Sequence, residues 1–179
     1  LRNHLILGEK ALIVLAADEA GRVVATESGA QFFHAYLKPQ SFRRVLSRHV
    51  RPGDLILNLT VDVSTLELVE YAADVGALYV DTSIEPWPGV FDNPMVELRQ
   101  RTNFLSRQRI LELARELGPD SPTAVVDHGA NPGLVSHFTK QALLDLQRIL
   151  RGTTVVPSTR EEWAVLARDL DVCCIQISE

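Results

Sequence analysis

ALYVDTSIEPWPG, residues 77–89, is the stretch that decides the fold of this chain. It begins as a strand, because Leu78 to Val80 are apolar and favour extended backbone. It turns polar at Asp81 to Ser83 and ends in a loop that two prolines stiffen around Glu85-Pro-Trp87. In an open parallel α/β sheet, ligands bind beyond the carboxyl ends of the strands. The stretch therefore predicts such a sheet, with a carboxylate and an indole at its binding crevice. This pair suits an amine, because carboxylates bond ammonium groups and Trp faces attract cations.

The rest of the chain alternates between apolar strands and amphipathic helices. Residues 11–17, ALIVLAA, are continuously apolar, as expected of a parallel strand covered on both faces. The other expected strands are 31–34, 55–59, the one that starts at Ala77, 123–126 and 172–178. The expected helices are 18–28, 39–49, 63–75, 95–117, 132–150 and 160–170. This alternation predicts an α/β protein with a Rossmann-like, doubly wound parallel sheet.

Both ends of the sequence resemble interrupted parts of that fold. Residues 1–10 resemble the end of a helix, and the strand at 11–17 leads into Asp18. An acid at the end of the second strand commonly binds the adenosine ribose in dinucleotide folds. The glycine fingerprint that precedes it by about 20 residues is absent here, and the last strand stops at Glu179. We therefore expect an internal fragment. The alternative is a small complete α/β domain in which Asp18 only caps a helix.

Composition excludes several classes of protein. The 179 residues are 46% hydrophobic and 23% charged, which is ordinary for a globular domain. No apolar run approaches the roughly 20 residues of a membrane helix, and no signal peptide opens the chain. A net charge of −5 argues against nucleic acid and is compatible with cationic ligands. Cys173 and Cys174 predict buried thiols in a late strand and a reducing, cytosolic setting. Neither these two cysteines nor His128 and His137 have the spacing of metal ligands, so no metal site is expected.

The segment from Asn58 to Ser64 also follows an expected strand. Its polar residues Asn58, Thr60 and Asp62 alternate with apolar ones, so they share a side that a cofactor would approach. The alternative is a strand end that caps the following helix through Asp62 or Ser64. The sequence leaves both interpretations open.

A third polar segment, GANPGLVS at 129–136, opens a helix after the strand at 123–126. Pro132 holds Asn131 extended, and Gly133 lets a backbone or a ligand approach closely. The helix N-terminus favours acceptors and anions. A capping role explains Asn131 equally well.

Glu85-Pro-Trp87 is harder to explain without a function. Trp87 as a packing residue and Glu85 as a solvated loop acid are the simpler alternatives. However, two prolines that fix the backbone around a Glu and a Trp are more than a plain connection requires. Trp163, on the helix at 160–170, is expected in the core rather than in a site.

Together these segments resemble the homospermidine synthase family, within the wider group of saccharopine-dehydrogenase-like enzymes. The resemblance covers most of the chain from Ala11 onward. It is carried by NLTVDVS at 58–64, GALYVDTSIEPWPG at 76–89, GPDSPTAVVDHGANPGLVSHFTKQALLD at 118–145 and VCCIQISE at 172–179. The EPW and GANPGLVSHF runs are its most specific parts.

The resemblance implies an NAD-dependent enzyme of polyamine biosynthesis. In the family reaction, NAD takes a hydride from putrescine to give an imine, a second amine exchanges with this imine and releases its nitrogen as ammonia, and NADH reduces the new imine to homospermidine. Putrescine and spermidine are the implied substrates, and a cytoplasmic homodimer is the implied full-length form. Residues 1–150 would form an NAD-binding domain without its first strand and glycine loop. Residues 151–179 would connect it to a substrate and dimerisation domain, and the fragment alone would be inactive.

The same resemblance assigns site residues. The polyamine site would be lined by Glu85, Asn131, Glu179 and Trp87. The dinucleotide would be flanked by Asp18, Asn58, Leu59, Thr60, Asp81, Thr82 and Ser83.

Two rival functions fit the same fold. An NADPH-linked reductase of the saccharopine or carboxynorspermidine type would need an Arg or Lys for its substrate carboxylate, whereas 85–89 offers acid and aromatic groups. Asp18 would also repel the 2′-phosphate of NADP. The other rival is a non-catalytic Rossmann-like module, which only an activity assay would distinguish from an enzyme.

Overall fold

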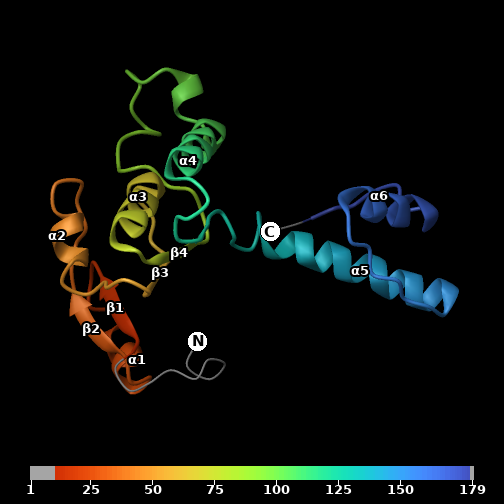
Figure 1. Cartoon of the computed structure of the whole chain (residues 1–179), viewed down its shortest axis with the longest axis horizontal. Coiled ribbons are helices and arrows are strands. Elements are labelled where there is room, and N and C mark those ends of the chain that lie inside the picture. Colours follow the sequence, from red (N-terminus) through yellow and green to blue (C-terminus); the bar gives the residue numbers. More distant parts are fainter. Residues whose placement is uncertain (1–10, 178–179) are drawn as a thin grey trace. The chain divides into compact units, whose positions relative to one another are not determined.

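The computed structural model describes residues 11–177 as an α/β chain of short strands and longer helices (Figure 1). Its strands are β1 (Ile13–Ala16), β2 (Gln31–His34), β3 (Leu55–Asn58), β4 (Leu78–Asp81) and β5 (Ala124–Val125). Its helices are α1 (Arg22–Glu27), α2 (Phe42–Leu46), α3 (Thr65–Val75), the 3-10 turn η1 (Leu98–Gln100), α4 (Asn103–Leu117), α5 (Leu134–Arg151) and α6 (Arg160–Asp169). Within the described residues, no helix is both long and apolar enough to cross a membrane.

The chain forms two compact units. The first contains the described residues up to Tyr79 together with Ile84–Ala124, and the second contains Val80–Ser83 and the described residues from Val125 onward. Strand β4 thus contributes its first half to one unit and its second half to the other. The division expected at residue 150 concerns a longer protein and stays a prediction.

The strands form two sheets, of order β1-β2 and β3-β4-β5. Strands β1 and β2 are parallel, with Ile13 opposite Gln31 and Ala16 opposite His34. Backbone bonds pair β4 with the β5 segment in rising order, from Tyr79 N to Thr123 O and then from His128 N to Asp81 O, so these strands are parallel too. A doubly wound sheet has the order 3-2-1-4-5-6. The two sheets reproduce its 3-2 and 4-5-6 parts, and its strand 1 has no counterpart in the described residues.

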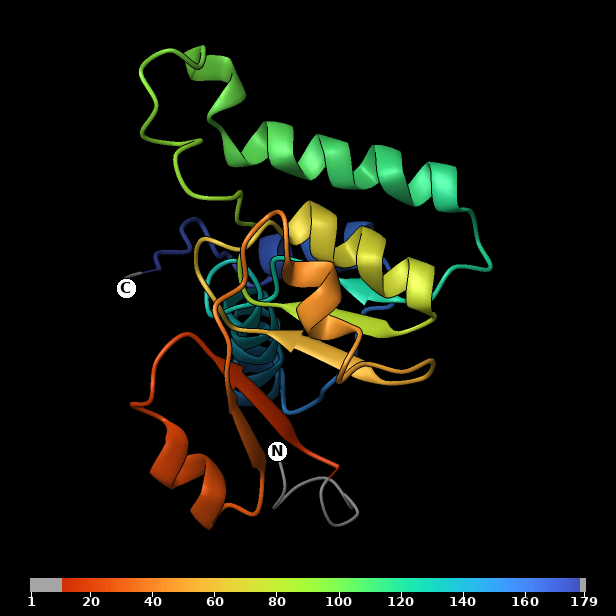
Figure 2. The same ribbon diagram turned by 90° about the vertical axis from the view of Figure 1, so that its left-hand side faces the viewer.

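The core of the first unit lies between α2, α3 and the sheet. Phe42 of α2 is 2% exposed and meets Tyr71 of α3 edge-on, with ring centroids 6.2 Å apart. Arg43 bonds Asp74 at 2.6 Å and Glu70 at 2.9 Å, and the Asp74 bond is the main cause of its raised pKa. Figure 2 shows α4 running alongside α3, which it contacts. Helix α3 is therefore packed on several sides, which makes it a firm support for the loops at its N-terminus.

Replacing Tyr71 by Phe should leave stability at neutral pH unchanged or raise it by up to about 1 kcal/mol. The Tyr71 hydroxyl is buried and has no hydrogen-bond partner among the described residues, so its removal leaves no new unpaired group. Burial also raises the pKa of Tyr71 above its ordinary value near 10. Because the pKa of Tyr71 is raised in the folded protein, the stability linked to its protonated form is fully present below about pH 10. That stability is lost as the pH rises through the folded pKa. Urea unfolding at neutral and alkaline pH checks this, and a loss of more than 1 kcal/mol at neutral pH would contradict it.

The second unit is built around α5 and α6, which pack together. Gln147 of α5 is 8% exposed, and its Oε1 accepts a hydrogen bond from Val155 N at 2.6 Å. Trp163 of α6 is half-buried, and Lys140 Nζ lies 5.3 Å from its ring centroid. The side chains of Thr159 and Glu162 close a reciprocal capping box at the start of α6. Trp163 is therefore only partly covered and does not lie in the buried core where it was expected.

Several predicted elements need correction. The helix expected at 95–117 is split, because Thr102 caps a new helix, α4, and only the turn η1 precedes it. Residues 172–177 of the strand expected at 172–178 form no strand, and they pair with none of the described strands. Cys173 and Cys174 are accordingly exposed rather than buried. The helix expected at residues 1–10 lies outside the described residues.

Four expected helices begin later than predicted, including the one at 63–75, whose first helical residue is Thr65. In α1 the N-cap is Gly21, so the alternative in which Asp18 caps this helix is wrong. In α2 only five residues are helical. In α5 the first helical residue is Leu134, after the positive φ of Gly133. In each case a polar loop at the carboxyl end of a strand takes residues that the pattern assigned to the helix.

Candidate functional site

Residues 85–88, which we call the EPW loop, follow β4 and are bound by the first turn of α3. Glu85 N donates to Thr65 Oγ1 at 3.0 Å, and Thr65 N donates to Glu85 O at 2.9 Å. Two residues later, Trp87 Nε1 donates to Glu67 Oε1 at 2.6 Å. The Trp87 ring also lies 5.6 Å from the Phe42 ring. The loop is therefore fixed at both its acid and its indole.

The Glu85 side chain is the group of this loop that remains available. It is half-buried, and within the described part of the chain no hydrogen bond or ion pair ties its carboxylate. Its neighbour Ile84 is 3% exposed and anchors the backbone just before it. A carboxylate on a fixed backbone, without a partner of its own, is suited to hold an ammonium group.

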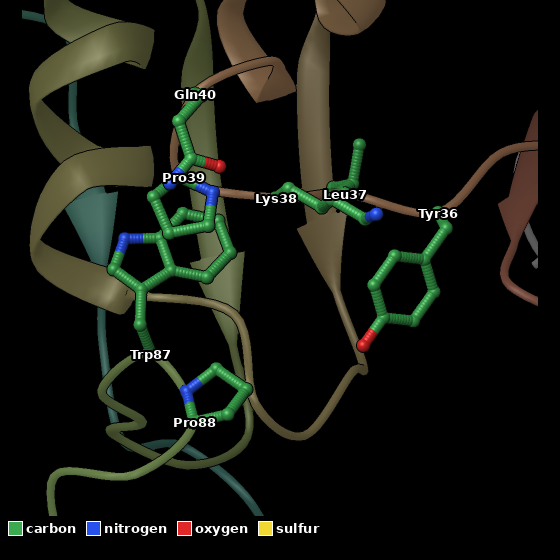
Figure 3. A pocket seen from close by; sticks show the side chains of 7 residues that line it. All are labelled: Tyr36, Leu37, Lys38, Pro39, Gln40, Trp87 and Pro88. Carbon is green, nitrogen blue, oxygen red and sulfur yellow. The ribbon is translucent and has the colours of Figure 1, made fainter.

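A pocket of about 230 Å³ lies beside Trp87 (Figure 3). It is lined by Tyr36, Leu37, Lys38, Pro39, Gln40, Trp87 and Pro88. Lys38 Nζ lies 5.6 Å from the ring centroid of Tyr36. None of these residues except Trp87 was predicted from the sequence, although 36–40 follows β2 at its carboxyl end, where the rule for parallel sheets predicts binding residues. The indole ring of Trp87 thus faces an open, largely apolar surface.

Asp18 lies in the loop after β1. Its Oδ1 accepts a hydrogen bond from Ala20 N at 2.9 Å, which fixes the carboxylate against its own loop. His34, at the end of β2, has Nε2 2.8 Å from Ala17 O and therefore supports the same loop. Glu19 forms a two-point ion pair with Arg22, and this pairing lowers the pKa of Glu19. The loop thus presents Asp18 as its exposed acid while the neighbouring Glu and Arg occupy each other.

Asn58 supports the end of β3 from inside. It is 6% exposed, its Nδ2 donates to Tyr79 Oη at 3.1 Å, and its Oδ1 accepts from both the backbone and the hydroxyl of Thr60. Leu59 is 65% exposed. Ser64 is the cap of α3, since its Oγ accepts from Glu67 N. The predicted capping alternative is therefore confirmed for Ser64, and Asn58 shapes the strand end by binding Thr60.

Asp81 and Thr82 fix the loop at 127–133. Asp81 is fully buried, and its Oδ1 accepts from Asp127 N at 2.6 Å. A Cβ on Gly129 would collide with Thr82 O, so this backbone approaches the end of β4 as closely as glycine allows. Ser83 is half-buried. Asp81 thus supports the loop at 127–133 from a buried position and is not itself exposed.

Asn131 lies at the tip of that loop and is exposed. Gly129 N donates to Pro132 O, Leu134 N donates to Gly129 O, and the peptide bond between Asn131 and Pro132 is cis. The N-cap of α5 is Gly133, without a side-chain cap bond. The alternative in which Asn131 caps this helix is therefore wrong, and its amide is left to face solvent or a ligand.

The predicted polyamine-site residues are divided between the two compact units. Glu85 and Trp87 belong to the first unit and Asn131 to the second, so their predicted convergence stays a prediction. Glu179 lies outside the described residues. The rings of His128 and His137 meet edge-on with centroids 5.3 Å apart. No cluster of three or more metal-ligating side chains occurs in residues 11–177.

Comparison with known proteins gives concordant similarities. Residues 2–125 match the family model described as the saccharopine dehydrogenase NADP binding domain. The whole chain is 38% identical to a homospermidine synthase of Blastochloris viridis and 29% identical to one of Mesorhizobium japonicum. It spans 38% of the length of each of these relatives. The crystal structure of the homospermidine synthase of Legionella pneumophila in complex with NAD has a TM-score of 0.69 and 32% identity to it. That match covers 89% of this chain and 32% of the other.

Proposed function

The chain belongs to the saccharopine dehydrogenase NADP-binding domain family, and on this premise we propose that it is the dinucleotide-binding part of a homospermidine synthase. The longer enzyme would convert putrescine to homospermidine with release of ammonia. The similarity of the whole chain to two homospermidine synthases supports this assignment. The division into an NAD-binding part at 1–150 and the start of a second domain at 151–179 belongs to the same proposal, as does a homodimeric, cytoplasmic form of the full-length protein.

The observation that carries the proposal is the state of the Glu85 carboxylate. The backbone of Glu85 is fixed by Thr65, but its side chain is half-buried and unpaired within the described residues. An unpaired carboxylate in a partly dry position favours a cationic guest. Putrescine carries an ammonium group at each end, so it supplies the positive partner that the Glu85 carboxylate lacks. The Trp87 ring beside the pocket adds a face that attracts the same cation.

NAD would supply the hydride chemistry, by accepting a hydride from the first amine and returning it after the second amine has attacked. Asp18 would accept a hydrogen bond from a hydroxyl of the adenosine ribose. Asn58, Leu59 and Thr60 would shape one side of the dinucleotide site, and Asp81, Thr82 and Ser83 another. Asn131 would orient the amine that Glu85 holds. Glu179 is proposed to line the polyamine site on the strength of the resemblance alone.

The loop at Asp18 fits NAD better than NADP. Arg22 is the cation nearest in sequence that would meet a 2′-phosphate, but its guanidinium is paired with Glu19 and lies 4.5 Å from the Phe32 ring centroid. A 2′-phosphate would therefore meet the Asp18 carboxylate without a free Arg beside it. This favours NAD for this member of a family whose description names NADP.

Replacing Asp18 by Asn in the full-length protein should lower its preference for NAD over NADP by about tenfold. The change keeps the shape but removes the charge that repels a 2′-phosphate and accepts from the ribose. Dissociation constants from equilibrium dialysis with both cofactors check this. An unchanged ratio, or no affinity of the unmodified protein for NAD, would overturn the assigned role of Asp18.

The proposed reaction is tested by incubating the full-length protein with putrescine and NAD. Homospermidine is measured by mass spectrometry and ammonia by a coupled assay, and we expect equal amounts of both. Reactions without NAD, and reactions with NADPH, an amino acid and an aldehyde, are the controls. Product only in the reductive reaction would replace the proposal by the NADPH-linked reductase. No product in any of the reactions would favour the non-catalytic module.

A further inference from the structure

We propose that the first turn of α3 is a positioning element for the amine site, with Thr65 setting Glu85 and Glu67 setting Trp87. Neither residue is expected to touch the substrate. The kinetic part of this inference rests on the proposed function. The structural part, the control of the Trp87 indole by Glu67, does not.

Thr65 fixes the peptide groups on both sides of Glu85. It is fully buried and makes two hydrogen bonds of opposite direction with that residue, one through its hydroxyl and one through its backbone N–H. Pro86 and Pro88 have no backbone N–H, so the N–H of Glu85 is one of the few donors this loop has. Its partner Thr65 therefore decides the direction in which the Glu85 side chain leaves the backbone.

Glu67 departs from the usual behaviour of a glutamate in the first turn of a helix. Ser64 and Glu67 have the S-x-x-E spacing of a capping box, in which the Glu side chain reaches back to the N-cap backbone. In α6 the same arrangement of Thr159 and Glu162 closes such a box in both directions. In α3 the Oε1 of Glu67 instead accepts the indole N–H of Trp87 at 2.6 Å. A carboxylate of capping type is thus used to hold a side chain of the EPW loop.

The two contacts act on neighbouring residues from a single turn. Helix α3 is well supported, with Leu68 and Ala72 each 2% exposed and Arg43 of α2 bonded to its outer face. The Trp87 ring is confined between this turn and Phe42, which is 2% exposed. A rigid helix therefore sets both the carboxylate and the aromatic face of the candidate amine site.

The test uses the full-length protein labelled with 5-fluorotryptophan, in which the Trp87 signal is the one missing from Trp87→Phe. In Glu67→Ala we expect this ¹⁹F signal to shift, since the indole loses its acceptor. We also expect KM for putrescine to rise about tenfold with kcat within about threefold, as for a lost cation–π contact. Glu162→Gln is the matched control, because it alters the capping carboxylate of α6, and it should move neither quantity. An unshifted Trp87 signal in Glu67→Ala would overturn the inference whatever the activity of the protein.

Thr65 is tested by a pair of variants. Thr65→Val keeps the shape but removes the hydroxyl that accepts from Glu85 N, and kcat/KM for putrescine should fall about tenfold. Thr65→Ser restores the hydroxyl and should recover activity to within about threefold. A purely structural role would instead lower the thermal stability of both variants with kcat/KM unchanged in the folded protein, and that result would contradict positioning by Thr65. If the unmodified enzyme does not act on putrescine, the proposed function fails while the ¹⁹F measurement still decides the role of Glu67.

Discussion

Replacing Glu85 by Gln in the full-length protein should lower putrescine turnover by about a hundredfold or more. The change keeps the size of the side chain and its backbone bonds to Thr65, but it removes the charge that pairs with the ammonium group. Charge-assisted bonds in a site that excludes water are among the strongest a protein makes, and losing one costs on the order of 10²–10³ in rate. NAD retention should be little changed, because Glu85 is assigned to the amine and not to the dinucleotide.

Steady-state kinetics with putrescine and equilibrium dialysis with NAD separate these two effects. Glu97→Gln is a suitable control, since Glu97 is an exposed acid paired only with Arg99 within the described residues, outside the assigned site. It should leave both turnover and NAD affinity unchanged. Near-normal turnover of Glu85→Gln, or a loss of NAD instead of turnover, would show that the assigned role is wrong.

Replacing Gly133 by Ala should destabilise the protein by about 3 kcal/mol or more and impair the positioning of Asn131. Gly133 has φ +129°, which side chains rarely adopt, and an added Cβ would lie 2.8 Å from Gly129 N and 2.9 Å from the carbonyl carbon of His128. These are backbone atoms, so they cannot rotate away as a side chain would. Strain of this kind costs on the order of 1–3 kcal/mol before the collision is added. The loop at 127–133 would have to open, and Asn131 would move with it.

Gly152→Ala is the matched control, at the other end of the same helix. Gly152 also has a positive φ, +67°, but a Cβ there would meet nothing within 4 Å. Its replacement should therefore lower the free energy of unfolding only by the cost of placing a Cβ on a left-handed backbone, about 1–2 kcal/mol. Urea unfolding of both variants measures the difference. Equal losses would mean that the contact with Gly129 contributes nothing.

Much of the fold could be predicted from the sequence because its signals are local. Strand β2 was expected at 31–34 and is found there, and the C-terminal ends of α3 and α4 follow from Gly76 and Gly118. Such residues act through their own backbone freedom, which needs no knowledge of the rest of the chain. The late strand at 172–178 failed for the opposite reason, since a strand exists only beside a partner that lies elsewhere in the chain.

The candidate site was predictable as a set of strand ends, but not as a set of contacts. The strand-end rule predicts Glu85, Asn131 and Asp18 as site residues, and these assignments stay predictions. It did not predict that Asp81 would turn inward to bind Asp127 N, because burial of a carboxylate depends on a partner 46 residues away. The bond between Glu67 and Trp87 was missed as well, since the spacing of Glu67 from Ser64 favours a capping box. Contacts between distant segments are decided by packing, which the local pattern does not record.

The division of the strands into two sheets has a consequence for how this chain opens. No backbone hydrogen bonds between strands join β1-β2 to β3-β4-β5 in the described residues, so the link between them depends on side chains. The Phe33 ring of β2 contacts the ring of His49, which lies in the segment between α2 and β3, with centroids 4.4 Å apart. Partners in β1 and β2 are only 18 residues apart, so this pair can re-form quickly after it opens. The two sheets should therefore exchange their amide hydrogens as separate cooperative units, and the loop of Asp18 belongs to the two-stranded one.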